Sequence, residues 1–360
     1  MTDEELMSLA LSLAAKGRGA TSPNPMVGAV LVRGDQIVGR GYHARAGGPH
    51  AEVVAIEEAG EAAFGSTLYC TLEPCCHRGL TGPCVERILR AGVKVVVVGV
   101  EDPDPRVDGG GIRQLREHGV AVRVGVCRMK ARRLNEVFFT VKRQSRPFVT
   151  LKVALSLDGR IAAGPGRLTQ LTGSSAIGHE HSLRAEVDAI GVGSETVLVD
   201  DPLLTARGKE RNRPLVRVLF DTRMRTPLTA RVLATLAEGP VVVMTTDAAL
   251  AKWPDRADAL RRVGAIVESL PARDPAKAIS RLLTYGVSDL LLEGGARLHQ
   301  AVWEAGVTDR LRLYIAPVRL GSTGVPWVSS SRLSIAALGG GRPRYLGPDL
   351  LLEADVHRFD

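Results

Sequence analysis

The chain has few aromatic side chains, with three Trp, five Tyr and six Phe among its 360 residues. Proteins that bind single-stranded nucleic acid stack bases on such side chains, so their scarcity argues against a nucleic-acid partner. No apolar run approaches the roughly 20 residues of a transmembrane helix. The N-terminal sequence Met1-Thr2-Asp3-Glu4-Glu5 is acidic, whereas a secretory signal begins with positive charge. We therefore expect a cytoplasmic location and no membrane partner.

Cysteine is also scarce, and it is unevenly distributed. Four of the five cysteines lie close together as Cys70, Cys75, Cys76 and Cys84. An odd number crowded into one segment does not suit a disulfide framework, whereas closely spaced thiols are typical of metal sites. The cysteines therefore predict a metal-binding segment.

The chain has fewer acidic than basic residues: 39 Asp and Glu compared with 47 Lys and Arg, which gives a net charge of +8. A positive field favours anionic partners. Because aromatic residues make up only 4% of the chain, phosphorylated small molecules are the expected partners. The alternative explanation of the positive charge is that the arginines are dispersed over the surface and bind no partner.

The length predicts two or three domains of roughly 100 to 200 residues each. Strand-like and helix-like patterns alternate through both halves, which favours an α/β fold with helix-covered, largely parallel sheets. A basic helical segment over 128–146 ends at Arg146-Pro147, where we place the boundary between domains 1–145 and 146–360. Two Gly- and Pro-containing stretches, 163–166 and 339–348, are expected to be loops. The expected strands cover 27–32, 37–41, 67–71, 93–100, 120–126, 148–155, 189–192, 216–220, 241–245, 266–268 and 289–293.

The most specific motif is His50-Ala51-Glu52, followed by Pro74-Cys75 and Pro83-Cys84. One imidazole, two thiolates and a spare carboxylate are the ligand set and general base of a zinc-dependent deaminase. Three protein ligands leave the fourth tetrahedral position for water, whose pKa falls to about 7 on zinc. The motif therefore predicts a Zn²⁺ site formed by His50, Cys75 and Cys84.

Glu52 and the two prolines have separate expected roles. Glu52 stands two residues after His50 on a helix, so it cannot share that ligand's direction, and we expect it to relay protons. Proline suits the first turn of a helix, so Pro74 and Pro83 predict that both cysteines lie at helix N-termini, where the dipole lowers the pKa of a thiol.

One alternative is a closed structural zinc site made of Cys75, Cys76, His77 and Cys84. Eight residues separate the two proposed cysteine ligands, whereas the compact deaminase motif has two. The insertion must form a loop over the site. A closed site would leave His50 and Glu52 without a role, so the open catalytic site is favoured.

These residues resemble the deaminase half of the bifunctional riboflavin-biosynthesis deaminase–reductases. The similarity covers the zinc motif, Pro23-Asn24-Pro25, Gly41-Tyr42-His43 and Asp102-Pro103-Asp104-Pro105. It implies a cytidine-deaminase-like domain in which His50, Cys75 and Cys84 bind zinc and Glu52 is catalytic. Asn24 and His43 become substrate contacts by the same resemblance. Their alternatives are a turn residue for Asn24 and a surface histidine for His43.

Two positions depart from the family pattern in this half. Leu80 stands where the family has a basic residue, so a basic contact to substrate is either missing or supplied by Arg78. Cys76 replaces a serine, and we expect it to be a buried, unreactive thiol.

In the second half, 289–293 is a strand-like run, Gly294-Gly295 a tight turn and 297–305 a helical pattern. A strand, a glycine turn and a helix N-terminus together form a cradle for a pyrophosphate. A plain strand-to-helix turn is the alternative.

A wider resemblance to the same family's reductase half supports the cradle. It covers 146–160, 183–185, 199–207 and 293–295, and it implies a dihydrofolate-reductase-like α/β domain that uses NADPH. Asp200 becomes a catalytic residue that steers protons as well as a cofactor contact. The implied substrate contacts are Arg184, Leu204, Arg207 and Glu293. The implied cofactor contacts are Ala154, Gln170, Thr196, Asp200, Thr222, Gly295, Ala296, Arg297 and Leu298.

Leu168 and Gln170 stand where the family has a serine and a tryptophan, so a hydroxyl contact to substrate and an aromatic surface for nicotinamide are both in question.

The sequence thus predicts deamination of a diaminopyrimidinone ribosyl phosphate followed by reduction of its ribosyl group to ribityl, in a homo-oligomer, either a dimer or a tetramer. Two alternatives are a related enzyme acting on a different pyrimidine in a secondary pathway and a deaminase with an impaired reductase half. From another class, the basic charge allows a nucleic-acid-binding or base-editing protein, which the scarce aromatics disfavour.

Overall fold

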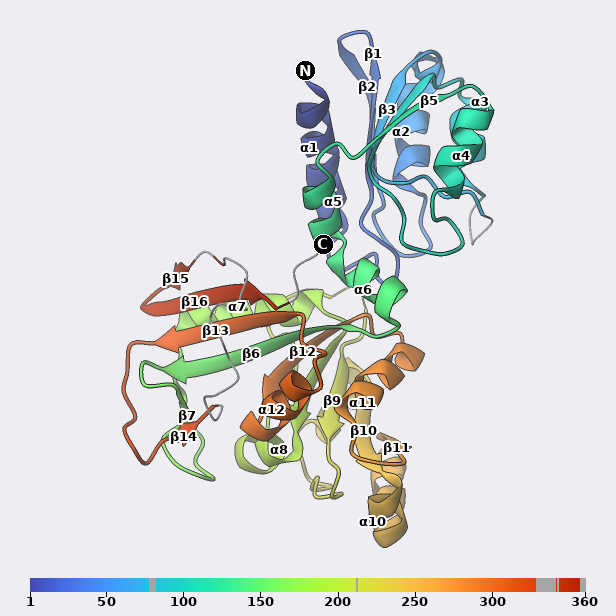
Figure 1. Cartoon of the computed structure of the whole chain (residues 1–360). Coiled ribbons are helices and arrows are strands. Elements are labelled where there is room, and N and C mark those ends of the chain that lie inside the picture. Colours follow the sequence, from blue (N-terminus) through green and yellow to red (C-terminus); the bar gives the residue numbers. More distant parts are fainter. Residues whose placement is uncertain (78–81, 212, 328–340, 342, 357–360) are drawn as a thin grey trace. The chain divides into compact units, whose positions relative to one another are not determined.

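The structure is a computed structural model that describes residues 1–77, 82–211, 213–327, 341 and 343–356. The chain divides into two compact units, Met1–Ser145 and Arg146–Asp360 (Figure 1). None of the helices in these described ranges is long and apolar enough to cross a membrane.

The N-terminal unit has a five-stranded sheet in the order β2-β1-β3-β4-β5. Strand β1 is antiparallel to both of its neighbours, and β3, β4 and β5 are parallel. The sheet is therefore mixed, and the largely parallel arrangement expected from the sequence holds for one side only. The strands are β1 (Gly28–Arg33), β2 (Gln36–Tyr42), β3 (Thr67–Leu72), β4 (Val95–Val100) and β5 (Ala121–Val124).

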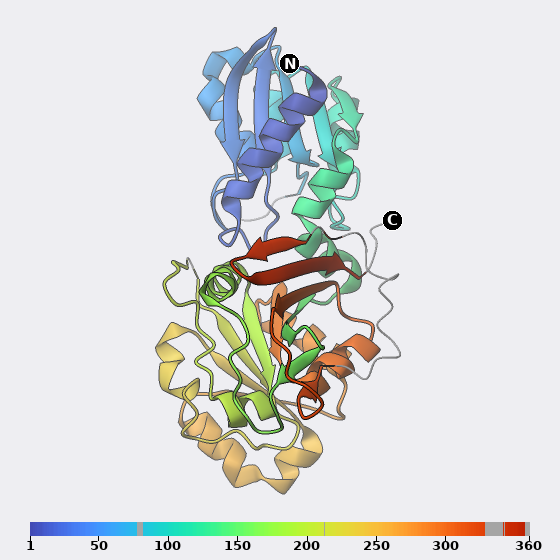
Figure 2. The same ribbon diagram turned by 90° about the vertical axis from the view of Figure 1, so that its left-hand side faces the viewer.

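Helices cover both faces of this sheet. Alternate residues of each strand point to opposite faces, so Leu31 and Leu68 pack under α2, α3 and α4, while Val30 and Tyr69 pack under α1. Figure 2 shows α1 and α5 crossing the opposite face from α2. The helices are α1 (Asp3–Ala14), α2 (Ala51–Ala59), α3 (Cys84–Arg90), α4 (Gly110–Glu117), α5 (Arg128–Leu134) and α6 (Glu136–Gln144).

The C-terminal unit has a nine-stranded sheet in the order β11-β10-β9-β8-β12-β6-β13-β16-β15. The first seven strands of that order are parallel, whereas β16 and β15 are antiparallel to their neighbours. Strands β7 (Arg160–Ala162) and β14 (Val325–Pro326) pair separately. The sheet strands are β6 (Phe148–Ser156), β8 (Ala189–Gly193), β9 (Val216–Phe220), β10 (Val241–Thr246), β11 (Ile266–Leu270), β12 (Asp289–Gly294), β13 (Arg310–Ala316), β15 (Arg344–Leu346) and β16 (Asp349–Asp355).

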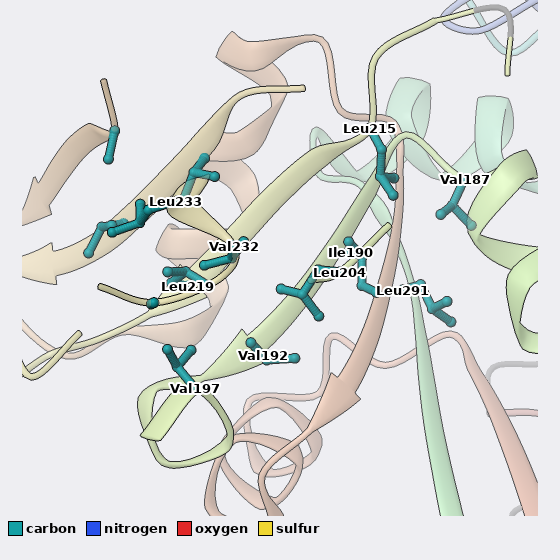
Figure 3. Packing of buried hydrophobic residues seen from close by; sticks show 14 of the residues in the cluster. Val187, Ile190, Val192, Val197, Leu204, Leu215, Leu219, Val232, Leu233 and Leu291 are labelled. Carbon is teal, nitrogen blue, oxygen red and sulfur yellow. The ribbon is translucent and has the colours of Figure 1, made fainter. Parts of the chain in front are cut away.

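Two apolar cores lie on the two faces of this larger sheet. One packs α7, α8, α9 and α10 against residues such as Ile190 and Leu219, and Figure 3 shows its labelled side chains converging. The other packs α11 and α12 against residues such as Val218 and Leu290. The helices are α7 (Ser174–Glu186), α8 (Ser194–Asp200), α9 (Asp247–Lys252), α10 (Pro254–Arg262), α11 (Pro275–Arg281) and α12 (Ala296–Glu304), and the short 3₁₀ helices are η1 (Ala15–Gly17), η2 (Gly60–Ala63), η3 (Leu233–Glu238) and η4 (Leu282–Tyr285).

The expected strands are all present with small shifts at their ends. One expectation was wrong, because β15 occupies Arg344–Leu346 within the stretch that we expected to be a loop. Its three residues pair with the strand that follows, between Gly341 and the Gly347-Pro348 turn. A strand this short has too few residues for an alternating pattern to stand out among glycines and prolines.

A buried ion pair ties the first strand of the C-terminal unit to the start of β13. The Arg146 guanidinium donates to both oxygens of Asp309, at 2.6 and 2.8 Å, and each side chain is only 7% exposed. Asp309 also accepts the backbone N–H of Val149 at 2.8 Å. Removing either charge leaves the other buried without its partner.

We expect Asp309→Ala to lower the free energy of unfolding of the C-terminal unit by about 3–5 kcal/mol, because the Arg146 charge would stay buried and unpaired. All three tryptophans (Trp253, Trp303 and Trp327) lie in this unit, so tryptophan fluorescence during urea denaturation reports on it alone. Asp258→Ala is the control, since it breaks the exposed Arg261–Asp258 pair and is expected to cost about 0.5 kcal/mol or less. Equal effects of the two changes would contradict the prediction.

Candidate functional site

One edge of the N-terminal sheet gathers the residues of the predicted zinc motif. His50 precedes the first residue of α2, and Glu52 lies in its first turn. Helix α2 runs so close over β2 that a Cβ at Gly41 would lie 2.2 Å from the carbonyl oxygen of Ala51. Only glycine permits this approach, which places His50 beside the end of β3.

The two cysteine sulfurs and the imidazole form a compact cluster. His50 Nδ1 lies 3.1 Å from Cys84 Sγ and 3.5 Å from Cys75 Sγ, and the three donor atoms all lie within 4.8 Å of one another. Zinc bonds of about 2.0 Å to nitrogen and 2.3 Å to sulfur require separations of this size. The donor set therefore fits Zn²⁺.

The structure distinguishes the open site from the closed alternative. Among the described residues, the cluster of possible metal ligands holds neither Cys76 nor His77. Cys76 is half-buried, and its sulfur instead contacts the carbonyl oxygen of Arg106 at 3.8 Å. His50, Glu52 and Cys75 line a cavity of about 330 Å³, which leaves space for a substrate beside the ligands.

The expected helix position is right for Cys84 and wrong for Cys75. Cys84 is the first residue of α3, after the capping Pro83, whereas Cys75 lies in the loop that follows β3. The N-terminus of α3 still stabilises a thiolate at Cys75, because the backbone N–H of Cys84 donates to the Cys75 sulfur at 3.3 Å. Pro74 marks the end of a strand here.

Hydrogen bonds and burial adjust the charges in this cluster. The Cys84 thiol donates to Cys75, and together with His50 and the Cys84 backbone N–H it lowers the pKa of Cys75 to about 4. The same contact raises the pKa of Cys84, and the bond to Cys75 raises that of His50. Burial raises the pKa of Glu52, which is 3% exposed, to about 6. A carboxyl group with that pKa can both accept and release a proton near neutral pH.

Asn24 and His43, the expected substrate contacts, lie together in the wall of the same cavity. The Asn24 amide lies 3.2 Å from His43 Nε2, and His43 Nδ1 lies 3.0 Å from the carbonyl oxygen of Pro49. The His43 ring is also packed edge-on against His50, with 5.5 Å between ring centroids. His43 is 3% exposed, so it is not a surface histidine, and burial lowers its pKa.

Glu73 is a residue that sequence reasoning missed. Its buried carboxylate accepts four backbone N–H groups, from Asp102 and Gly109 on one oxygen and from Gly111 and Ile112 on the other, at 2.9–3.1 Å. The bonds tie the zinc loop to 102–112, which includes the first turn of α4. A lone Glu between a strand and Pro74-Cys75 was the only sequence signal.

The segment held by Glu73 brings further charges to the cavity. Asp104 pairs with Arg106 at 2.6 Å and Lys142 at 2.8 Å, and Arg106 above all holds the pKa of Asp104 below its ordinary value. Burial raises the pKa of Asp102 to about 7. All four residues line the cavity. Leu80 and Arg78, where a departure was expected, lie outside the described residues.

In the C-terminal unit, a cavity of about 530 Å³ lies at the carboxyl ends of β8, β9, β10, β11 and β12. Thr222, Gly295, Arg297 and Leu298 of the expected cofactor contacts line it. Thr196 touches the glycine turn, since a Cβ at Gly294 would lie 2.7 Å from its Oγ1. The lining does not include Ala154, Gln170, Asp200 or Ala296.

The four remaining expected cofactor residues, which lie outside this lining, can be placed by their elements and contacts. Asp200 ends α8 and is exposed as a whole residue, but partial desolvation of its carboxyl group raises its pKa. Ala154 is on β6, and Ala296 is the first residue of α12. In the loop before α7, Gln170 donates to the carbonyl oxygen of Thr172 at 2.9 Å, and Leu168 is 71% exposed.

The expected substrate residues of this unit gather around an ion pair. Arg184 donates to both oxygens of Glu293, at 2.7 and 2.5 Å, and to the carbonyl oxygen of Thr205 at 3.1 Å. Burial opposes the charge on Glu293, but Arg184 keeps its pKa below the ordinary value. Leu204 is buried next to Thr205 with a φ of +55°, and Arg207 is exposed.

Lys152 and Glu180 form a second buried pair that sequence reasoning missed. Lys152 Nζ lies 2.6 Å from Glu180 Oε1, with side-chain exposures of 9% and 11%. Electrostatic interactions link Glu180 to Glu293 and Arg184, so the two pairs form one network. A lysine in the middle of the apolar strand Phe148–Ser156 was a signal that could have been noticed.

Comparison with known families and structures agrees with both units. The cytidine and deoxycytidylate deaminase zinc-binding region matches residues 1–100, and the RibD C-terminal domain matches residues 147–337. The riboflavin biosynthesis protein RibD of Aquifex aeolicus is 44% identical over 319 residues, covering 89% of this chain and 88% of that protein. RibD of Bacillus amyloliquefaciens is 39% identical over 357 residues, covering 98% and 96%.

Solved structures show the same arrangement over almost the whole chain. Acinetobacter baumannii RibD superposes with a TM-score of 0.84 at 36% identity, covering 98% of each chain. The Thermotoga maritima diaminohydroxyphosphoribosylaminopyrimidine deaminase/5-amino-6-(5-phosphoribosylamino)uracil reductase gives 0.84 at 32% identity, again covering 98% of each. Fold and site therefore define a zinc-dependent pyrimidine deaminase joined to an NADPH-dependent, dihydrofolate-reductase-like reductase. The chain belongs to the RibD family of riboflavin-biosynthesis enzymes, as its motifs predicted.

We expect Glu73→Gln to raise the KM for the deamination substrate about tenfold with little loss of zinc. A glutamine amide has one acceptor oxygen, so two of the four backbone donors would lose their partner, at about 1.5–3 kcal/mol each. Hydrogen exchange at the amides of Gly109, Gly111 and Ile112 measures the loosening directly, alongside ammonia release and zinc content. Glu101→Gln is the matched control, because Glu101 pairs with the exposed Arg128 and not with the backbone of 102–112. Unchanged exchange in the Glu73 variant would contradict the assignment.

Proposed function

We propose that the N-terminal domain, residues 1–145, hydrolytically removes an amino group from a diaminopyrimidinone ribosyl phosphate. The C-terminal domain, residues 146–360, then reduces the ribosyl group of the product to ribityl. The observation that carries the first step is the cluster of His50, Cys75 and Cys84 beside a cavity that is lined by His50, Cys75 and the buried Glu52. The phosphorylated substrate is taken from the name of the Thermotoga maritima relative.

In the deaminase domain, His50, Cys75 and Cys84 would hold Zn²⁺, and Cys75 is already disposed to be a thiolate. Bound zinc supplies a Lewis acid that lowers the pKa of water to about 7. Glu52 lies in the same cavity and receives the proton that the attacking water loses. Its carboxyl group then delivers this proton to the ring nitrogen and passes a second proton, from the hydroxyl group left on the ring carbon, to the departing amine.

Asn24 and His43 would hold the pyrimidine ring. When the Asn24 amide N–H donates to His43 Nε2, the His43 N–H on Nδ1 donates to Pro49. The amide carbonyl of Asn24 can then accept a hydrogen bond from an amino group of the ring. Burial keeps His43 neutral, which preserves this arrangement at neutral pH.

In the reductase domain, NADPH would supply the hydride. The Gly294-Gly295 turn, Thr196, Thr222, Ala296, Arg297 and Leu298 would bind its phosphates and ribose groups, with Ala154 and Gln170 toward the nicotinamide. Arg184, Glu293, Leu204 and Arg207 would hold the ribosyl phosphate, because guanidinium groups form paired hydrogen bonds to phosphate. Asp200 would pass a proton to the substrate, and partial desolvation raises the pKa of its carboxyl group.

We also propose a cytoplasmic homo-oligomer, either a dimer or a tetramer. The five cysteines are all free thiols, and two of them are zinc ligands that need a reducing compartment. Strands β11 and β15 form the two edges of the nine-stranded sheet, where Ile266 and Tyr345 are 38% and 78% exposed. Such edges pair readily with a second copy, and light scattering of the purified chain would measure the mass.

We expect Glu52→Gln to slow ammonia release at least about a hundredfold, because the amide cannot accept and return a proton. Zinc content should stay at one ion per chain, and NADPH oxidation with previously deaminated substrate should be unchanged. Glu57→Gln is the control, since Glu57 is an exposed residue of the same helix that pairs with Arg87. Full deamination by the Glu52 variant would remove this residue from its role.

The altered loop at Leu168 and Gln170 favours two other candidates: a related enzyme that acts on a different pyrimidine in a secondary pathway, and a deaminase with an impaired reductase half. We expect the chain to rescue a riboflavin auxotroph that lacks both activities, since Arg184, Glu293 and the glycine turn are in place. If the soluble, zinc-loaded protein fails to rescue, normal ammonia release without NADPH oxidation would support the impaired reductase, and no ammonia release from this substrate would support the different pyrimidine.

A further inference from the structure

The cavity of the N-terminal unit follows the strand ends from β2 to β4. His43 follows β2, Asn24 precedes β1 and Cys75 follows β3, while the lining residues between 102 and 106 follow β4. These four strands are consecutive neighbours in the sheet. Neighbouring strands lie about 4.8 Å apart, so the span from β2 to β4 is roughly 14 Å. The cavity is therefore longer than a single pyrimidine ring.

The proposed reaction places the ring at one end of this cavity. The carbon that loses its amino group must lie beside the zinc ligands and Glu52, and Asn24 and His43 hold the ring on the β2 side. The ribosyl phosphate that is attached to the ring must then extend toward β4 and α6. The residues that line this other end are Asp102, Asp104, Arg106, Phe138 and Lys142.

One buried carboxylate holds two cations at the β4 end. Asp104 is 5% exposed, and it accepts hydrogen bonds from Arg106 Nε at 3.0 Å and from Arg106 Nη2 at 2.6 Å. Lys142 Nζ lies 2.8 Å from the same carboxylate. Glu73 fixes the backbone on both sides of the turn that carries Asp104 and Arg106. The two cations are therefore held in place before any ligand binds.

The pairing leaves positive charge and hydrogen-bond donors unused. Two cations share one carboxylate, and no residue in the described part of the chain accepts a hydrogen bond from Arg106 Nη1. The Arg106 and Lys142 side chains are 64% and 27% exposed, so solutes can reach them. Asp102, the other acid at this end, accepts the backbone N–H of Asp104 at 2.8 Å. Burial raises the pKa of Asp102 to about 7, so it is only partly ionised near neutral pH.

We propose that Arg106 and Lys142 bind the phosphate of the ribosyl phosphate during deamination and make the deaminase select phosphorylated over dephosphorylated substrates. The inference rests on the proposed deamination in this cavity. A guanidinium group donates paired hydrogen bonds to phosphate oxygens, and an ammonium group adds a compact positive charge with further donors. Asp104 acts as the positioning residue, because it orients both cations without using all of their donors.

This pair also gives the leucine at position 80 a physical explanation. The family has a basic residue there, whereas a leucine side chain offers neither charge nor a hydrogen-bond donor. Arg106 and Lys142 supply positive charge from two other segments, the turn after β4 and helix α6. The basic contact to substrate is then relocated rather than lost, and Arg78 is not needed for it.

The test compares deamination of the diaminopyrimidinone ribosyl phosphate and of the same compound without its phosphate by the full-length, zinc-loaded protein. We expect Arg106→Ala and Lys142→Ala each to raise the KM for the phosphorylated compound about tenfold, with kcat and the kinetics of the dephosphorylated compound changed less than about twofold. Arg106→Lys keeps the charge and should lose less. Arg90→Ala and Lys130→Ala are the matched controls, because both residues are exposed and lie outside the cavity lining.

Two further measurements use the variant in which both Arg106 and Lys142 are replaced by alanine. Ribose 5-phosphate should inhibit the wild-type protein competitively and this double variant only weakly, whereas ribose should inhibit neither. The KM for the phosphorylated compound should rise with ionic strength in the wild type, because salt screens partly exposed charges, and it should rise less in the double variant.

The outcomes separate the phosphate contact from the reaction itself. If the zinc-loaded wild-type protein deaminates neither compound, the proposed function fails. If it deaminates the phosphorylated compound but the Arg106 and Lys142 variants lose activity toward both compounds equally, or toward neither, the assignment of these two residues is wrong. If Arg78→Ala alone raises the KM for the phosphorylated compound, the phosphate contact lies at Arg78 instead.

Discussion

The deaminase site depends on one geometric constraint: an imidazole and two sulfurs from separate segments must lie within 4.8 Å of one another and still leave one side open. The sheet meets this constraint at a single edge. Strands β2 and β3 both end there, because β1 is antiparallel to both of them. His43 therefore follows β2 and Cys75 follows β3 at the same edge, and α2 and α3 begin beside them. Glu73 holds this edge together by joining the zinc loop to 102–112 through four backbone hydrogen bonds.

The zinc ligands could be predicted from the sequence, because the residues next to each ligand form a recognisable motif. His50 and Glu52 are two residues apart at the start of a helix, and Cys84 follows a proline that begins another. Cys75 was misplaced because the same Pro-Cys pair occurs at the end of a strand. Its thiolate is stabilised by Cys84, nine residues away, and no local pattern reveals such a contact. For the same reason Glu73, whose partners lie 29 to 39 residues further on, had no visible role.

In the C-terminal unit, the sequence predicted local elements but not the contacts between residues far apart in the chain. The strand, the Gly294-Gly295 turn and α12 were predicted from residues alone, and the alternation of strands and helices predicted the fold class. The mutual pairing of Arg184 and Glu293 was not predicted, because 109 residues separate them. The family resemblance assigned both to the substrate, and it could not show that each is the other's partner. The mixed N-terminal sheet was missed in the same way, since the pairing of β1 with β3 depends on tertiary packing.

Buried charge in the reductase unit orients side chains more than it adds stability. Lys152–Glu180 and Arg184–Glu293 place four charged side chains, each between 7% and 13% exposed, in one network. Desolvating such groups costs several kcal/mol per ion, and well-packed apolar residues often stabilise a fold at least as well. The pairs nevertheless hold each side chain in one orientation, and Arg184 keeps Glu293 ionised despite its burial. An anion that approached Arg184 would have to share the guanidinium with Glu293, so the pairing would weaken such binding while it keeps the carboxylate in place.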